Sequence, residues 1–124
     1  MIQIILFSSL VAHAWAQVTC AQAPTPNNEE YDVKSFTLKV GPRYEAICGD
    51  HVYVHYAPPS AGSTSGVLRI ASDGYGPRFI ISVNGPVQGG ETPVRNNLFW
   101  INNGDDCKTN FPAFEPRSVY CYKA

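Results

Sequence analysis

The stretch of the sequence richest in groups that could do chemistry is Asp50–Tyr56, which reads DHVYVHY. In an extended strand, successive side chains point to opposite faces, so His51, Tyr53 and His55 share one face and the apolar residues between them share the other. Two imidazoles could bind a metal ion or transfer protons. However, His51 and His55 would lie roughly 13 Å apart along a strand, too far for two bonds to one ion. We interpret this face as a polar and aromatic contact surface for a sugar or a protein; a solvated strand face opposite buried valines is the simpler alternative.

No spaced catalytic motif accompanies these side chains. The G-x-S-x-G motif is absent, so nothing supports a Ser-His-Asp triad. A small secreted ribonuclease would need a histidine and a glutamate as acid and base with an arginine nearby. Residues of these types are present, on composition alone, in His51, His55, Glu45, Arg69 and Arg78. We expect binding without turnover, and a small secreted hydrolase or ribonuclease is the alternative.

A second candidate contact surface lies at the end of the chain. In Ser118–Lys123, Tyr120 and Tyr122 alternate with Cys121, so both tyrosines face outward if the cysteine faces inward. Exposed tyrosines add contact area with few rotatable bonds. Trp100, in contrast, is expected to pack in the core. The predicted binding residues are therefore His51, Tyr53, His55, Tyr120 and Tyr122.

The charge of the chain argues against nucleic acid as a partner. Nine Lys and Arg face ten Asp and Glu, a formal net charge of -1, and the cations form no run. The glycine pairs at Gly74-Tyr75-Gly76 and Gly89-Gly90 do not open a helix after a strand, so they predict turns and not phosphate loops. We expect no cofactor, no metal site and a monomer whose partner is a protein or a carbohydrate.

The first sixteen residues have the pattern of a secretory leader. An apolar run, Ile2–Val11, precedes Ala14-Trp15-Ala16, which places small residues at the two positions that signal peptidase inspects. The run is too short to span about 30 Å of hydrocarbon. We predict a signal peptide over residues 1–16, cleavage after Ala16, and a secreted, extracellular protein with no membrane segment.

Export makes disulfides the expected state of the four cysteines, Cys20, Cys48, Cys107 and Cys121. Their separations of 28, 59 and 14 residues do not match the close pairs of structural zinc sites. Three pairings are possible, and the sequence does not choose among them. We favour Cys20 with Cys121 and Cys48 with Cys107, because the first bond would tie the two ends of the mature chain together.

Short strands and frequent turns organise the rest of the chain. Residues 17–30 carry no usable periodicity and predict an irregular arm, whereas residues 31–124 predict one β domain. Phe36, Leu38 and Val40 mark the first strand by their alternation. Residues 57–66, APPSAGSTSG, predict a mobile surface loop. Further strands are expected over residues 44–48, 51–56, 67–71, 78–83, 98–101 and 118–123. We predict an all-β fold, a small antiparallel β-sandwich or barrel of about seven short strands stapled by disulfides.

This layout resembles that of the small secreted, cysteine-containing effector proteins of plant-pathogenic fungi. The shared features are a cleavable leader, a mature chain near one hundred residues, a cysteine close to each end and an all-strand pattern. Some of these effectors are disulfide-linked β-sandwiches of the MAX type, which typically have two cysteines where this chain has four. The resemblance implies a virulence-type protein that acts by binding a host protein or another ligand, without catalysis. A carbohydrate- or cell-wall-binding module is a further alternative.

Overall fold

The computed structural model describes residues 18–35, 43–87, 97–111 and 117–124. The predicted leader, the alternating residues Phe36, Leu38 and Val40, and the glycine pair Gly89-Gly90 lie outside the described residues. The described segments contain strands, turns and bends and no helix, hence no helix long and apolar enough to cross a membrane.

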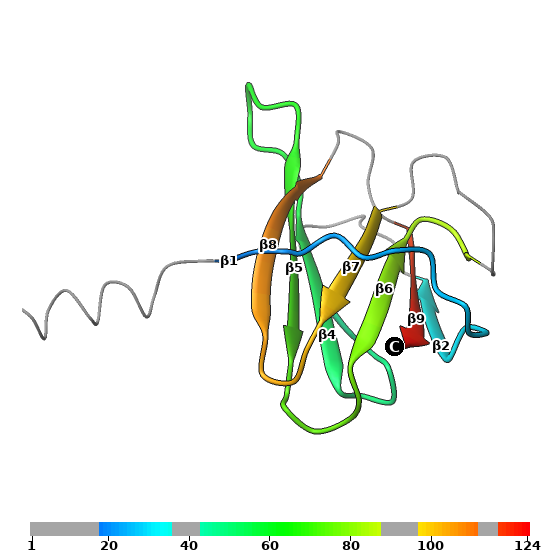
Figure 1. Ribbon diagram of the computed structural model, residues 1–124. Helices are drawn as coiled ribbons and strands as arrows, with labels where there is room; N and C mark the ends of the chain where they lie inside the picture. Colours follow the sequence, from blue (N-terminus) through cyan, green and yellow to red (C-terminus); the bar gives the residue numbers. More distant parts are fainter. Residues whose placement is uncertain (1–17, 36–42, 88–96, 112–116) are drawn as a thin grey trace, which may run out of the picture.

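The described chain is all-β, as predicted, with its strands in two sheets (Figure 1). The five-stranded sheet has the order β1-β8-β5-β4-β3, with strands β1 (Val18–Thr19), β8 (Asp106–Phe111), β5 (Gly66–Ser72), β4 (Val52–Ala57) and β3 (Arg43–Ile47). The four-stranded sheet has the order β2-β9-β6-β7, with strands β2 (Asp32–Ser35), β9 (Ser118–Lys123), β6 (Phe79–Val83) and β7 (Asn97–Ile101). All neighbours are antiparallel except β1 and β8.

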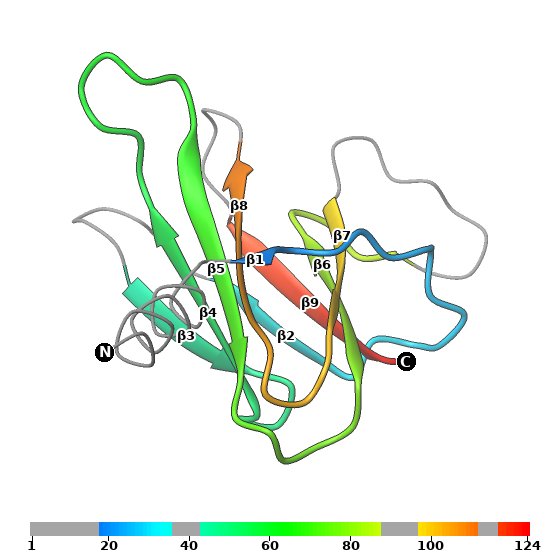
Figure 2. The ribbon, with the colours of Figure 1, turned by 60° about the vertical axis from the view of Figure 1, so that its left-hand side comes forward.

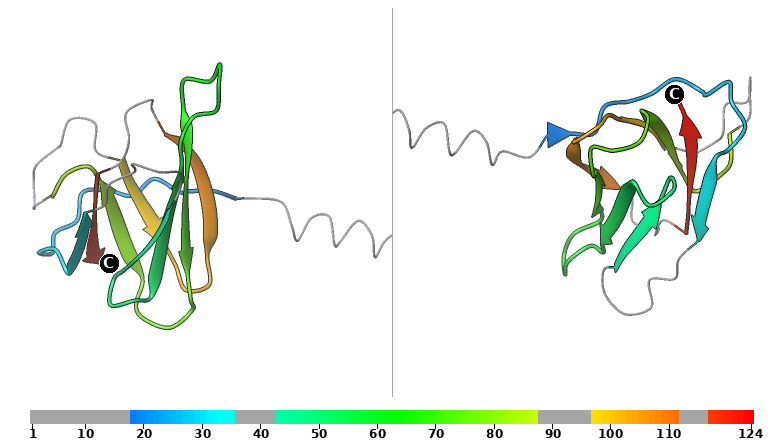
Figure 3. Two further views of the ribbon diagram at one scale, coloured as in Figure 1. Left: turned by 180° about the vertical axis from the view of Figure 1, so that it is seen from behind. Right: turned by 90° about the horizontal axis from the view of Figure 1, so that it is seen from below.

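The inner faces of the two sheets pack on each other in a sandwich-like core. The right-hand view of Figure 3 shows the two sheets from below. Alternation of apolar residues with polar or exposed ones along the strands produces this core. In β4, Val52, Val54 and Tyr56 are fully buried, whereas the residues between them face away from the core, as predicted. The opposite sheet contributes alternating residues such as Phe79 and Ile81 of β6. The prediction that β4 has one core face and one outer face is therefore confirmed.

The N-terminal arm is more ordered than its composition predicts. Val18 and Thr19 pair in parallel with Cys107 and Lys108 of β8. The arm then crosses to the other sheet, where the amide of Trp100 donates to the carbonyl of Ala21 and the amide of Ala23 donates to that of Leu98. The expectation of an irregular arm is wrong for this part, because backbone pairing with two strands distant in sequence orders a segment that has no hydrophobic period of its own.

Strand β8 is the second element that the sequence pattern did not predict. It reads DCKTNF, and only Cys107 and Phe111 are buried. Because its outer face is polar and its buried positions are four residues apart, the segment shows no alternation of apolar residues. Its neighbours β5 and β1 supply the hydrogen bonds that make it a strand.

Residues between β4 and β5 project from the body as a loop (Figure 2). Residues 60–64 of this loop are exposed, as expected for the predicted surface loop. Both flanking strands belong to the five-stranded sheet, so the loop extends one end of that sheet beyond the sandwich.

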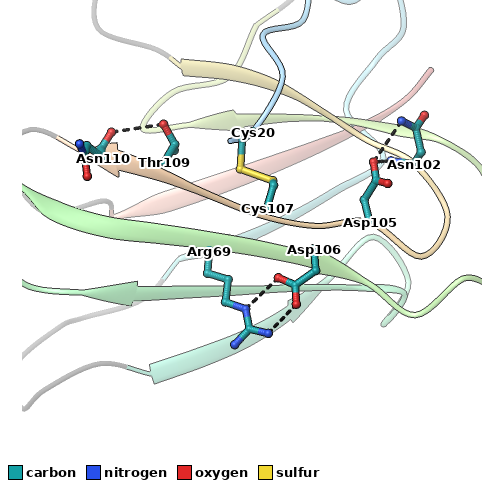
Figure 4. The surroundings of a disulfide bond; sticks show 8 residues. All are labelled: Cys20, Arg69, Asn102, Asp105, Asp106, Cys107, Thr109 and Asn110. Atoms are coloured by element: carbon teal, nitrogen blue, oxygen red, sulfur yellow. Dashed lines mark hydrogen bonds and ion pairs between the residues drawn. A yellow bond between two sulfur atoms is a disulfide. The ribbon is translucent and has the colours of Figure 1, made fainter. Parts of the chain in front are cut away.

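Two disulfides form, as predicted, but their pairing differs from the favoured one. Cys20 bonds to Cys107 of β8 (Figure 4), and Cys48, which follows β3, bonds to Cys121 of β9. The favoured pairing is wrong because the arm lies beside β8 in the five-stranded sheet, whereas Cys121 belongs to β9 of the four-stranded sheet. The second bond therefore joins the two sheets. Two disulfides are compatible with an extracellular protein.

Candidate functional site

The outward-facing residues of the five-stranded sheet form a row that crosses four strands. Tyr44 of β3 lies opposite His55 of β4, His55 lies opposite Arg69 of β5, and Arg69 lies opposite Lys108 of β8. Residues directly opposite each other in antiparallel strands project to the same face. Tyr53 and Asp106 occupy the adjacent row. We call these six residues, Tyr44, Tyr53, His55, Arg69, Asp106 and Lys108, the outer face.

Close contacts fix the central part of the outer face. The rings of Tyr44 and His55 stack with centroids 4.2 Å apart and planes inclined by 20°. Arg69 donates from Nη1 to the hydroxyl of Tyr44 over 3.2 Å. It also donates from Nε and Nη2 to the two carboxylate oxygens of Asp106, over 2.8 and 2.6 Å (Figure 4). This two-pronged geometry orients the guanidinium, and through it the Tyr44 ring, which remains 56% exposed.

The charges of the outer face do not cancel. Burial lowers the pKa of His55, and the nearby cations Arg69 and Lys108 lower it further, so the ring is neutral at pH 7. The hydrogen bonds from Arg69 lower the pKa of Asp106 and keep it ionised as the counter-ion of that arginine. Within the described residues, no hydrogen bond or ion pair holds the ammonium group of Lys108. The outer face therefore presents one cation in excess.

We expect the lowered pKa of His55 to make folding sensitive to mild acid. Between about pH 7 and pH 5, the unfolded imidazole, with an ordinary pKa near 6.5, takes up a proton before the folded one does. The free energy of unfolding should therefore fall as the pH falls through this window. Urea titrations at several pH values measure this slope, and it should be shallower in His55→Gln. An identical slope in the variant would contradict the assignment.

His51 lies next to the outer-face residue Tyr53, in the turn before β4. Tyr53 is 38% exposed and donates its hydroxyl hydrogen to the carbonyl of Asp50 over 3.0 Å. His51 lies 3.2 Å from the carboxylate of Asp73, and its ring packs so tightly on Gly76 that a Cβ there would approach it to 2.9 Å. His51 thus holds a turn in place. Among the described residues, no group of three or more His, Cys, Asp or Glu side chains could hold a metal ion.

The predicted second surface at Tyr120 and Tyr122 is not an open one. Tyr122 does point away from the core, but it is fully buried in a second apolar cluster on the outer side of the four-stranded sheet. Val87 covers it and donates its backbone hydrogen to the Tyr122 hydroxyl. Tyr120 is half-buried beside this cluster. The expectation that both tyrosines are exposed is therefore wrong, and they lie on the other sheet from His51, Tyr53 and His55.

Trp100 belongs to the rim of the same cluster. It is half-buried, and the guanidinium of Arg78 lies 3.5 Å from its ring centroid. The expected core packing of Trp100 therefore holds in part, since the ring packs outside the four-stranded sheet and not between the sheets.

The residue types of a ribonuclease site are not brought together. Glu45 lies opposite Val54, whose side chain is in the core, so Glu45 is on the side of the sheet away from His55 and Arg69. Arg78 stacks on Trp100 at the other sheet. The imidazoles and the glutamate therefore do not face a common space.

Sequence reasoning named Arg69 only for a ribonuclease site, and it missed Tyr44, Asp106 and Lys108 as members of the outer face. A usable signal existed for the last two, because they flank Cys107 as Tyr120 and Tyr122 flank Cys121. If the half-cystine faces inward, its neighbours face outward. Alternation in β3 also separates Tyr44 from Glu45, but only the register with β4 shows that Tyr44 stacks on His55.

A groove adjoins the outer face at β8. It has a volume of about 370 Å³ and is lined by Thr19, Val67, Lys108, Thr109 and Asn110. No protein-family model, curated protein or solved structure matches the chain. The chemistry of the outer face and of this groove is accordingly the guide to function.

Proposed function

We propose that this chain is a secreted, non-enzymatic binding protein of the effector type, which holds a host protein or another ligand on its outer face. The observation that carries the proposal is the exposed Tyr44 ring, which is stacked on His55 and hydrogen-bonded to an arginine that Asp106 already orients. Contact groups fixed before binding lose little conformational entropy on binding. Tyrosine and arginine are also the side chains that most often dominate binding energy.

The environment of the titratable groups supports binding without turnover. Both histidines and Asp106 have structural partners: His51 contacts Asp73, Asp106 binds Arg69, and His55 stacks on Tyr44. A general base and a nucleophile would instead have to converge on one reacting atom. The disulfides support export, since such bonds persist in oxidising compartments.

The proposal is tested by ligand capture from a plant extract, the host that the effector resemblance implies. The mature chain, beginning at Gln17, is immobilised and its binding to the extract is followed by biolayer interferometry. We expect Tyr44→Ala/Tyr53→Ala to lose at least tenfold in bound ligand, because each tyrosine contributes about 1 kcal/mol or more. Tyr75→Ala is the matched control, because Tyr75 is 74% exposed and lies in a turn beyond the outer face.

Unchanged capture by the folded double variant would contradict the proposed surface. Turnover is tested separately with RNA and polysaccharides as substrates, and none is expected. A hydrolysis rate abolished by His51→Ala or His55→Ala would show that the protein is an enzyme.

A further inference from the structure

We infer that the ligand of the outer face is an acidic saccharide, a chain of sugar rings bearing carboxylate groups. This inference rests on the proposed function, because it names the ligand class for the same surface. A carboxylate would lie at Lys108, with a sugar ring against Tyr44. The two residues are three strand spacings apart in the row, roughly 14 Å, so the ligand is an oligosaccharide and not a single sugar.

The first argument is charge complementarity. On this face the described strands carry two groups whose charge is cancelled or absent. Arg69 is neutralised by Asp106, and His55 is neutral at pH 7. Lys108 remains as a cation held by no hydrogen bond or ion pair within the described residues. Its ammonium group is a mobile point charge with three donors, suited to a carboxylate that binds from solvent.

The second argument is the chemistry of the groove beside Lys108. Thr19 and Asn110, with hydroxyl and amide side chains, line this space of about 370 Å³ together with Thr109, whose side chain alternation places on the other side of β8. These groups both donate and accept hydrogen bonds, as sugar hydroxyls do. Val67 is the one apolar residue that lines the groove. Polar residue types therefore outnumber apolar ones along the groove, as a hydroxyl-rich ligand needs.

The third argument is the exposed ring at the other end of the row. One side of Tyr44 is stacked on His55, and the residue is 56% exposed. The face of an aromatic ring is electron-rich and attracts the polarised C–H groups of a sugar ring. Because Arg69 fixes the hydroxyl of Tyr44, the ring is presented in one orientation.

An acidic peptide fits this surface less well. Extended peptides usually add to a free strand edge. In this sheet β3 is such an edge, but a peptide paired with it would run along β3 and not across the row to Lys108 of β8. Peptides that bind by their side chains generally need apolar pockets. The groove offers only Val67 for that purpose.

Isothermal titration with two chemically matched probes tests the inference. The acidic probe is an oligogalacturonate, and the neutral probe is the same oligosaccharide with its carboxylates methyl-esterified. We expect the acidic probe to bind at least tenfold more tightly, with an affinity that falls as salt is raised. Lys108→Gln should remove this preference, Lys108→Arg should retain most of it, and Lys34→Gln, an exposed lysine of β2, should change nothing.

Two results would overturn the inference: equal affinity for the two probes, or no effect of Lys108→Gln on the binding of the acidic one. Failure to bind either probe also overturns it. If extract capture still depends on Tyr44 and Tyr53 in that case, the proposed function stands with another ligand. Loss of that capture after protease treatment of the extract would identify a protein. If capture is independent of both tyrosines, the proposed function fails as well.

Discussion

Replacing Cys48 and Cys121 together by alanine is expected to lower the free energy of unfolding by about 4–5 kcal/mol. The bond joins residues 73 positions apart. In the simple chain-entropy model, closing a loop of that length restricts the unfolded chain and so stabilises the fold by about 4 kcal/mol. Both half-cystines are fully buried between the sheets, so removing the sulfurs also leaves a cavity. A domain of this size has a net stability of only about 5–15 kcal/mol, so between about a third and nearly all of it would be lost.

Urea unfolding without reductant measures this loss, and Cys20→Ala/Cys107→Ala is the matched control. Its separation of 87 residues gives nearly the same chain entropy. However, Cys20 and Cys107 are slightly exposed, at 4% and 5%, and join the arm to a strand that it already pairs with. We expect the smaller loss for this pair. An equal or greater loss would show that burial between the sheets adds nothing to the Cys48–Cys121 bond.

Tyr122→Ala is expected to cost about 3–5 kcal/mol of stability, the usual range for removing a buried aromatic ring. Tyr122 is fully buried and forms the second apolar cluster with Ile80 and Val87. Tyr122→Phe keeps the ring but leaves the buried amide of Val87 without its acceptor, so it should cost about 1–3 kcal/mol.

The same urea experiment separates the two contributions. The difference between Tyr122→Ala and Tyr122→Phe reports the packing of the ring, and the loss in Tyr122→Phe reports the hydrogen bond. Near-neutral behaviour of Tyr122→Ala would mean that the ring is exposed in solution, as its alternation with Cys121 alone had predicted.

Alternation in the sequence predicted the direction of side chains, a property that depends on a single strand. The alternation in β4 correctly placed Val52, Val54 and Tyr56 in the core and Tyr53 and His55 away from it. The outward direction of Tyr122 was equally local and equally correct. Its burial was not predictable in this way, because the covering residues come from the segment after β6 and from the arm.

Properties that depend on strand order could not be read from local patterns. The pairing of the cysteines requires knowing that β9 lies inside the four-stranded sheet and that the arm lies beside β8. The stack of Tyr44 on His55 requires the register between β3 and β4. The candidate site is therefore predictable in part. Its β4 residues follow from alternation and its β8 residues from their places beside Cys107, whereas the row that joins them depends on the register of the strands.

The central claim, that ligand binds on the outer face of the five-stranded sheet, is tested most directly by nuclear magnetic resonance. The isotope-labelled mature protein is titrated with the fraction of plant extract that the immobilised protein captures. Amide shift changes should centre on Tyr53 and His55 of β4, Arg69 of β5 and Lys108 of β8, and should spare Ile80 and Tyr122. Changes centred on Ile80, Trp100 and Tyr122, or no changes at all, would contradict the claim.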